Sequence, residues 1–568
     1  MRDARVRAIL RGSQPPLRQI WPAVAFGVLS AGSAVALLAV SAWLITRASE
    51  QPSLIYISVA VVGVRAFALG RAAFRYLERL VGHDAAFRQL ASIRAGMVDT
   101  IVPLAPDGLG TTRRGDLLSA LADDVDELQN RSLRVVQPLV TAAIVSVVTV
   151  VGLAILLPAD ALILAIALVL AGLVGTLVNG SVASKAQRLI APLRAELNDR
   201  VLDLIGNLPV LTAFGALEEA NGRAVAAGAA LTRAIRSRAS GAALTAGVVS
   251  VLAGAATVGA FFVAIPALEA QRLDAPTLAV LALVPLAIFE VFGMVPLALS
   301  ARRQVVASAE RIAGTIPVGI PAGIPVDGVD SSPLPATTGD DPVLVLDRVT
   351  AHWPGSTQPI LHDVSLRLGR GERMVIEGPT GAGKTALAHV LIRFIDYGGS
   401  YRVSGVEARD LAQDDVRTLV GLCEQQPYLF DSDIRQNLLF ARDTATDADL
   451  EAVLGRVGLA DWLHERGGLD ARVGERGSLV SGGQAQRIAL ARALLADVSV
   501  LIVDEPTANV DLDVADRIVR DIVTVAAAAG AAVILISHVA VPSELVDQRV
   551  RMEDGRLRPV SPEGVSAL

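Results

Sequence analysis

The chain has 568 residues, of which 52% are hydrophobic, with a mean hydropathy of +0.51 and a formal net charge of −6. This length accommodates more than one domain, and the apolar content exceeds that of an ordinary soluble protein. The mild acidity argues against a broad basic surface for nucleic acid, and the single cysteine, Cys423, excludes an internal disulfide and a cysteine-based metal cluster.

The apolar residues are concentrated in the first half, where six stretches have the length and the lack of charge of membrane spans. They cover about 20–45, 53–75, 133–157, 160–179, 242–266 and 276–299. The first stretch is too long for the apolar region of a cleavable signal peptide. Arginine is dense before the first span and after the second, so the positive-inside rule predicts a cytoplasmic N-terminus.

Two long, charged loops, about 76–132 and 180–241, are predicted on that same side of the membrane. Their periodicity predicts helices that extend the spans into the cytoplasm. A hairpin of this kind can be simply a solvated surface element. Two of them on the same side of the membrane favour a role in transmitting conformational change.

Charged residues occur inside two of the predicted spans. Arg65 lies within the second span, where an unpaired cation is costly and is usually functional, and Glu290 in the sixth span is a candidate partner for it. At 100° per residue, Tyr76, Arg79 and His83 fall within roughly 40° of Arg65 on one helix face. The pattern predicts a polar face that reaches from the membrane to its boundary.

This polar face has two interpretations. The imidazole of His83 can ligate haem iron, and Arg79, about 6 Å away along the helix axis, can pair with a haem propionate. The alternative is a helix end whose arginine and histidine face lipid headgroups and are paired by Glu78 and Asp84. The residues alone leave both open.

A linker divides the chain. Residues 313–342 are rich in Pro, Gly and Ser and lack periodicity, so we expect a membrane domain over 1–312 and a second domain over 343–568. In the second domain, strand-like runs such as VLVLDRV and MVIEG alternate with helical segments. This alternation predicts an α/β domain, fused to an α-helical membrane domain of six transmembrane helices.

The segment from Gly378 to Thr385 reads G-x-x-x-x-G-K-T, the phosphate-binding P-loop. Lys384 is one of only two lysines in the chain, and its compact ammonium fits between phosphate oxygens where the wide fork of arginine does not. Thr385 is expected to ligate Mg²⁺. The predicted phosphate-binding residues are Gly378, Pro379, Thr380, Gly381, Ala382, Gly383, Lys384 and Thr385. The predicted fold class is therefore an α-helical membrane domain of six transmembrane helices fused to an α/β P-loop nucleotide-binding domain.

Two further strands are followed by residues that suit ATP hydrolysis. SVLIVD ends at Asp504, which can hold Mg²⁺ through water, and the adjacent Glu505 suits the base that orients the attacking water. His538 follows the strand AVILIS and can contact the γ-phosphate. A histidine after a strand is usually structural, but the other parts of the site favour function.

The sequence VSGGQ at Val480–Gln484, followed by AQRIALARALL, resembles the signature of ATP-binding cassette (ABC) proteins. The resemblance covers 343–560. It implies that Trp353 stacks on adenine and that Gln425 senses Mg²⁺ and the membrane domain. It also implies a D-loop aspartate at Asp511 and a switch role for His538. The signature residues that would complete the ATP site of a partner subunit are Ser481, Gly482, Gly483 and Gln484.

Six spans with long hairpins ahead of one cassette resemble the ABC exporter architecture, in which each such chain is a half-transporter. The resemblance implies coupling helices near Gly115–Leu128 and Asn198–Phe214. It also implies a receiving surface on the cassette that includes Phe430.

The membrane segment Gly63–Arg88 resembles the CydC subunits of the CydDC exporter family, as do LLAVSAWLI in the first span and RRGDLLSALADDVDEL in the first hairpin. The resemblance implies a heterodimer with a CydD-like half-transporter in the bacterial plasma (inner) membrane, required for cytochrome bd assembly. It implies haem or low-molecular-weight thiols (cysteine, glutathione) as cargo. It also puts His83 at a haem-ligand position, which adds haem b to ATP and Mg²⁺ as a cofactor. Cys423 lies in the cassette and gives no support for thiol chemistry.

Two other functions remain open at this point. One is a homodimeric exporter of lipid, drug or peptide, and the other is a regulatory ABC subunit that senses haem. A soluble DNA-repair or translation ATPase is excluded by the six predicted spans.

Overall fold

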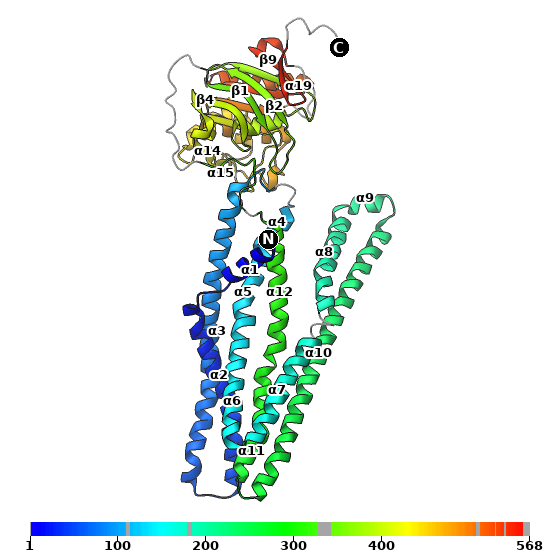
Figure 1. Cartoon of the computed structure of the whole chain (residues 1–568). Coiled ribbons are helices and arrows are strands. Elements are labelled where there is room, and N and C mark those ends of the chain that lie inside the picture. The colour runs from blue at the N-terminus through cyan, green and yellow to red at the C-terminus, as the bar shows by residue number, and fades with distance from the viewer. Residues whose placement is uncertain are drawn as a thin grey trace. The chain divides into compact units, whose positions relative to one another are not determined.

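A computed structural model describes residues 2–109, 114–178, 184–317, 319–327, 342–506, 512–528, 530–538 and 541–560. The chain folds as two compact units. Unit 1 comprises Met1–Asp99 and Thr112–Ile316, and unit 2 comprises Thr100–Thr111 and Pro317–Leu568. Figure 1 shows the helices of unit 1 and the mixed α/β fold of unit 2.

The described residues of unit 1 form helices joined by short connections and contain no β-strand. Its helices are α1 (Arg2–Gly12), α2 (Leu17–Ser49), α3 (Leu54–Ile101), α4 (Arg114–Ser119), α5 (Val125–Asn130), α6 (Gln137–Leu156), α7 (Pro158–Val178), α8 (Ser184–Gly206), α9 (Leu208–Ala213), α10 (Leu217–Glu269), α11 (Ala275–Phe292) and α12 (Met294–Thr315). Two π-helical turns, Ala120–Asp124 and Arg131–Val136, join α4, α5 and α6 into one continuous rod.

Five helical stretches are long and apolar enough to cross a membrane: Leu17–Ser49, Leu54–Leu104, Leu117–Leu156, Leu217–Glu269 and Ala275–Thr315. They contain five of the six predicted spans, and the remaining span coincides with α7, which is apolar over Pro158–Val174. With 48 and 53 residues, α3 and α10 are about 72 and 80 Å long, far more than a bilayer core needs. The helical extension predicted for the long hairpins is thus present, and Figure 1 shows α9 at the tip between α8 and α10.

Small residues let α3 approach α2 closely. A Cβ built at Gly70 would lie 3.4 Å from the hydroxyl of Ser33, and one at Gly63 would lie 3.8 Å from Val40. The hydroxyl of Ser30 on α2 donates to the backbone carbonyl of Arg71 at 3.1 Å. These contacts fix the rotation of α3 about its axis, and with it the face that carries the charged side chains.

Unit 2 contains two sheets. The antiparallel sheet has the order β2-β1-β4-β5 and the larger, mostly parallel sheet has the order β10-β9-β3-β8-β7-β6. The strands are β1 (Leu344–Ala351), β2 (Leu361–Leu368), β3 (Arg373–Glu377), β4 (Tyr397–Val403), β5 (Val406–Glu407), β6 (Val420–Cys423), β7 (Val500–Asp504), β8 (Ala532–Ser537), β9 (Gln548–Glu553) and β10 (Arg556–Pro559). The central strands β7 and β8 are buried at every position, because helices cover both faces of a parallel sheet.

The helices of unit 2 are α13 (Lys384–Leu391), α14 (Gln413–Leu419), α15 (Ile434–Leu439), α16 (Asp447–Arg456), α17 (Ala460–Glu465), α18 (Gly482–Leu495) and α19 (Leu512–Ala528). The parallel strands β3, β7 and β8 end at the same edge of the sheet, since they pair in parallel with one another. The segments that follow these strands therefore meet there, as is usual for ligand sites on open α/β sheets.

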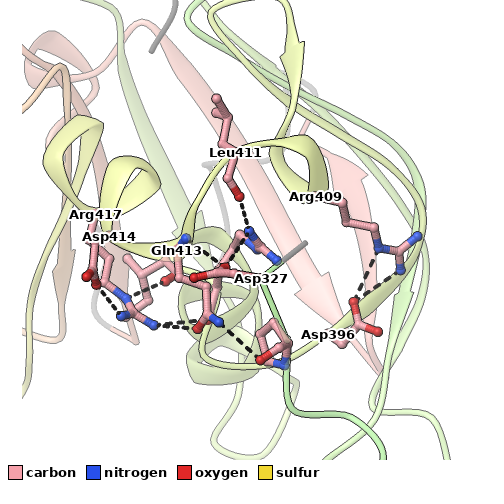
Figure 2. A network of polar contacts seen from close by, with 10 residues as sticks. Asp327, Asp396, Arg409, Leu411, Gln413, Asp414 and Arg417 are labelled. Atoms are coloured by element: carbon pink, nitrogen blue, oxygen red, sulfur yellow. Dashed lines mark hydrogen bonds and ion pairs between the residues drawn. The ribbon is translucent and has the colours of Figure 1, made fainter. Parts of the chain in front are cut away.

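Part of the predicted linker is bound to unit 2. The carboxylate of Asp327 accepts the backbone N–H of Gln413 at 3.0 Å and lies 3.6 Å from the guanidinium of Arg393. The side-chain amide of Gln413 donates to the carbonyl of Pro325 at 3.1 Å. Figure 2 shows Asp327 and Gln413 within a larger network of arginine and aspartate contacts on this face.

The two segments predicted as coupling helices belong to different helices of unit 1. The described part of Gly115–Leu128 belongs to the rod formed by α4, the first π-helical turn and α5 in unit 1. The neighbouring segment Thr100–Thr111 clusters instead with unit 2, where Leu104 is buried and a Cβ at Gly108 would lie 3.2 Å from Ile324. In Asn198–Phe214, Leu208 and Val210 of α9 are exposed, and so is Phe214 directly after this helix.

Candidate functional site

The P-loop connects β3 to α13, as the sequence predicts. Gly381 and Gly383 have φ values of +84° and +106°, which an L side chain rarely adopts. A Cβ at Gly378 would collide with the carbonyl oxygen of Met552 on β9. The glycines of this motif are thus required by the loop conformation and by close packing of the backbone.

Lys384 begins α13 and is only 5% exposed. Its ammonium donates to the carbonyls of Gly378 and Pro379 at 2.8 and 3.1 Å, and it lies 3.6 Å from a carboxylate oxygen of Glu505. The loop therefore holds a buried positive charge at the N-terminus of a helix, where backbone dipoles also favour an anion.

A set of hard oxygen ligands lies beside this charge. The hydroxyl of Thr385 donates to the carboxylate of Asp504, at the end of β7, at 3.1 Å. Burial raises the pKa of Asp504, and the bond from Thr385 lowers it in part. A buried carboxylate next to a hydroxyl fits Mg²⁺, since the cation would offset the cost of keeping Asp504 ionised.

Three predicted catalytic residues meet at Glu505. Its backbone has φ of +45°, an uncommon value for glutamate, and its N–H donates to the carbonyl of Ile536 at 2.9 Å. The side-chain amide of Gln425 donates to its carboxylate at 2.8 Å, and Nδ1 of His538 lies 3.5 Å from the same oxygen. The carboxylate is thus oriented by an amide and faced by an imidazole, which suits positioning of a water near the γ-phosphate.

Trp353 follows β1 and is half-buried, with its ring edge-on to His389 at 5.7 Å between centroids. Nδ1 of His389 lies 2.7 Å from the carboxylate of Asp107 in the Thr100–Thr111 segment. The sequence interpretation missed both residues. His389 stands five positions after Lys384, but nothing in the sequence relates it to Asp107, which is 282 residues away.

The signature residues form the start of α18. The hydroxyl of Ser481 accepts the backbone N–H of Gln484, and Gln484 bonds back to the Ser481 N–H, a capping box. A Cβ at Gly482 or Gly483 would meet no atom within 4 Å. In the part of the chain that the structure describes, no hydrogen bond or ion pair joins the signature to the P-loop. Asp511 lies outside the described residues.

The polar face predicted on the second span lies on α3. Arg65, Tyr76, Arg79 and His83 are all exposed on α3, and the ring of His83 lies 5.7 Å from that of Phe87. Within the described residues, Arg65 makes no ion pair or hydrogen bond. Tyr76, Arg79 and His83 therefore share one exposed face of α3.

The proposed pairing of Glu290 with Arg65 was wrong. Glu290 on α11 instead accepts from Arg71 at 3.1 Å. Six residues separate Arg65 from Arg71, which corresponds to about 240° of rotation and 9 Å along the helix, so the two arginines face different neighbours. The alternative interpretation expected Glu78 and Asp84 to pair with the arginine and histidine of this helix end. Glu78 instead accepts from the side-chain amide of Gln137, and Asp84 pairs with Arg88.

Residues 361–508 match the ABC transporter family, and residues 19–289 match the ABC transporter transmembrane region. The glutathione/L-cysteine transport system ATP-binding/permease protein CydC of Escherichia coli (strain K12) is 31% identical over 467 residues, covering 81% of this chain and 79% of that protein. The protein CydD of the same system in Bacillus subtilis (strain 168) is 28% identical over 544 residues, covering 93% of this chain and 91% of that protein.

A solved structure of a bacterial Atm1-family ABC exporter with ATP bound has the same fold. Its TM-score is 0.75 with 22% sequence identity, and the alignment covers 95% of this chain and 94% of that one. The predicted fold class is thereby confirmed, with a helical membrane domain joined to an ABC nucleotide-binding domain.

Proposed function

Since this chain belongs to the CydC/CydD family of ABC transporter ATP-binding/permease proteins, in which ATP hydrolysis is coupled to transport, we propose that it is the CydC-like half of a heterodimeric exporter. Its partner is then a CydD-like half-transporter, and the pair serves cytochrome bd assembly. The multi-pass membrane domain would lie in the bacterial inner membrane with the N-terminus and the cassette in the cytoplasm, as the arginine distribution favours.

One observation carries this proposal. The residues proposed to bind phosphate and Mg²⁺ and to orient water lie close to Glu505, whereas the signature helix begins at an open surface. One chain therefore has a site for nucleotide and a separate surface that can close over the nucleotide of another chain. This division of parts is what a half-transporter needs.

The residues have distinct roles in hydrolysis. Lys384 and the loop N–H groups would hold the phosphates, while Thr385 and Asp504 would hold Mg²⁺, which neutralises charge on the phosphate oxygens. Glu505 would position the attacking water, with Gln425 and His538 fixing its carboxylate. Trp353 would stack on adenine, and Asp511 with Ser481–Gln484 would act at the interface with the partner.

Two cargoes are compatible with the family. Relatives that match most of this chain are named as parts of a glutathione/L-cysteine transport system, which favours low-molecular-weight thiols. Haem remains an alternative because of the exposed face with Tyr76, Arg79 and His83. If haem b binds there, the purified transporter has a Soret band that His83→Ala removes, and an unchanged band would exclude His83 as the ligand.

The test of the ATPase assignment is Glu505→Gln in the transporter purified with its partner. We expect ATP to bind normally and turnover to fall about 100-fold or more, because the group that orients water is lost. Glu451→Gln, on the exposed surface of α16, is the matched control and should leave turnover unchanged. Full turnover in Glu505→Gln would show that the partner's site performs the hydrolysis.

A further inference from the structure

A partly exposed ion pair joins α3 and α11, two helices of unit 1 that are apolar enough to cross a membrane. Arg71 on α3 is 40% exposed and Glu290 on α11 is 68% exposed, with one guanidinium nitrogen 3.1 Å from one carboxylate oxygen. Glu290 is the only charged residue in α11, and it follows the buried Ile288 and Phe289. This pair has no part in the nucleotide site.

The two charges lie at matching depths. Arg71 is 17 residues beyond Leu54 and Glu290 is 15 residues beyond Ala275, which places them about 26 and 23 Å from the starts of their helices. Figure 1 shows that the α2–α3 and α10–α11 connections lie at the same end of unit 1. A hydrocarbon core is about 30 Å thick, so both side chains fall within or at the inner boundary of the membrane.

The charge of both side chains argues against a lipid-facing position at this depth. Charged side chains in spans face protein or water, because lipid tails cannot solvate them. The contact between Arg71 and Glu290 is end-on. Among the described residues, the other guanidinium N–H groups of Arg71 and the second carboxylate oxygen of Glu290 have no protein partner. A pair of this kind keeps hydrogen-bonding capacity for a third group.

Contacts between helices fix the backbone positions from which the two charged side chains extend. The carbonyl of Arg71 accepts from Ser30, and Phe74 stacks with Phe26 of α2 at 6.3 Å between centroids. α2 in turn packs along α11. The two charged side chains are thus presented from helices whose backbones are fixed, while the side chains themselves can separate.

We propose that Arg71 and Glu290 form the recognition site for the zwitterionic head of an amino-acid cargo. Arg71 would bind the α-carboxylate and Glu290 the α-ammonium, so that one internal ion pair is exchanged for two ion pairs with the cargo. This inference rests on the proposed export of thiols, and it states what cysteine and glutathione share apart from the thiol: a free ammonium next to a carboxylate.

The same geometry disfavours haem as cargo at this position. Haem carries two propionates and no ammonium, so a propionate bound to Arg71 would bring negative charge next to Glu290. An arginine alone would accept any of these molecules. The acidic partner is what selects a zwitterion.

The experiment measures ATP-driven uptake in proteoliposomes that contain the transporter with its partner. The probes are L-cysteine, N-acetyl-L-cysteine, which lacks the ammonium, and cysteamine, which lacks the carboxylate. For the wild type we expect a KM for L-cysteine about tenfold lower than for either analogue, the effect of one charge-assisted bond. In Glu290→Gln the preference over N-acetyl-L-cysteine should shrink to about twofold, and in Arg71→Gln the preference over cysteamine should shrink likewise.

Two controls separate recognition from a structural role. Glu290→Asp keeps the charge and should keep the wild-type preference, and Glu219→Gln removes an exposed ion pair with Arg223 on α10 and should change nothing. An unchanged preference for L-cysteine in Glu290→Gln would overturn the assignment, as would equal uptake of all three probes by the wild type. If the wild type takes up none of the three, the proposed thiol export fails, and this assignment with it.

Discussion

At the residue scale, Lys384 is defined by two opposite kinds of neighbour. Its ammonium donates to two backbone carbonyls, and the carboxylate of Glu505 lies 3.6 Å from it. A bound phosphate would compete with the carboxylate of Glu505 for the ammonium of Lys384, because both groups are anions. The volume around the ammonium is small, as its 5% exposure shows.

Lys384→Arg tests whether shape matters as well as charge. The planar fork of arginine is wider than an ammonium and should not fit between the two carbonyls, so we expect nucleotide binding to weaken at least tenfold, or about 1.4 kcal/mol. Binding of a fluorescent ATP analogue to the purified transporter measures this. Lys185→Arg changes the only other lysine and should bind like the wild type, whereas normal binding in Lys384→Arg would show that charge alone suffices.

Cys423 is the only thiol, and burial raises its pKa to about 12. It is 3% exposed at the end of β6, so it should remain protonated and unreactive toward the proposed thiol cargo. Because its pKa is higher in the folded than in the unfolded state, its contribution to stability is complete below about pH 8.5 and is lost as the pH rises through 12.

We therefore expect iodoacetamide at pH 8.5 to leave the folded protein unmodified and to alkylate one thiol after unfolding in denaturant. Mass spectrometry of the intact chain measures both states. In Cys423→Ala, the free energy of unfolding should fall less between pH 8.5 and 12 than it does in the wild type. Rapid alkylation of the folded chain would contradict the burial of this residue.

At the element scale, the segment 319–327 behaves as part of the cassette. α14 begins after Ala412, whose side chain cannot cap a helix, and Asp327 supplies the missing acceptor to Gln413 from 86 residues away. The same carboxylate faces Arg393, which is 2% exposed and whose guanidinium pKa is lowered by burial. One residue thus completes a helix end and neutralises a buried cation.

Asp327→Ala should lower the free energy of unfolding of the cassette by about 1–2 kcal/mol, the usual effect of losing a cap. Asp327→Asn keeps an oxygen for the Gln413 N–H and should lose less. The melting temperature of the purified chain reports both changes, at about 2–4 °C per kcal/mol for a unit of this size. Equal stability of wild type and Asp327→Ala would mean that the contact contributes nothing.

Local motifs made the nucleotide site predictable, whereas contacts between distant helices were not. Asp504 ends a strand of the mostly parallel sheet, and Lys384, Glu505 and His538 come after strands of the same sheet, so order along the chain was enough to bring them together. The partner of Glu290 depends on helix rotation and on the packing of α3 against α2, which periodicity within one helix does not reveal. Composition marked Asp327 as linker because its partners stand far away in the sequence.

At the scale of the whole molecule, apolar side chains remain exposed outside the membrane spans. On the hairpin around α9, Phe214 is 83% exposed, together with Leu208 and Val210. The cassette has a groove of about 440 Å³ lined by aromatic and apolar residues that include Phe394, Tyr428 and Phe430. Surfaces of this kind indicate contacts with a further polypeptide.

We expect the tagged chain to purify with a second, non-identical ABC half-transporter in equal amounts. The open signature surface requires a partner cassette, and the proposed heterodimer supplies it. Co-expression with an untagged copy distinguishes the alternatives, since a heterodimer does not retain the untagged copy on the affinity resin. Recovery of the untagged copy with the tagged one would instead favour the homodimeric exporter.

The contact between Asp327 and the start of α14 also affects where the cassette can be separated from the rest of the chain. A cassette cut at residue 343, where the α/β pattern begins, would remove the acceptor for the first N–H of α14 and the carboxylate of Asp327 that faces Arg393. A chimaera that exchanges cassettes between half-transporters should therefore carry residues 319–327 with the cassette to which they are bound. The place where one module ends is set by these hydrogen bonds and not by the change in composition.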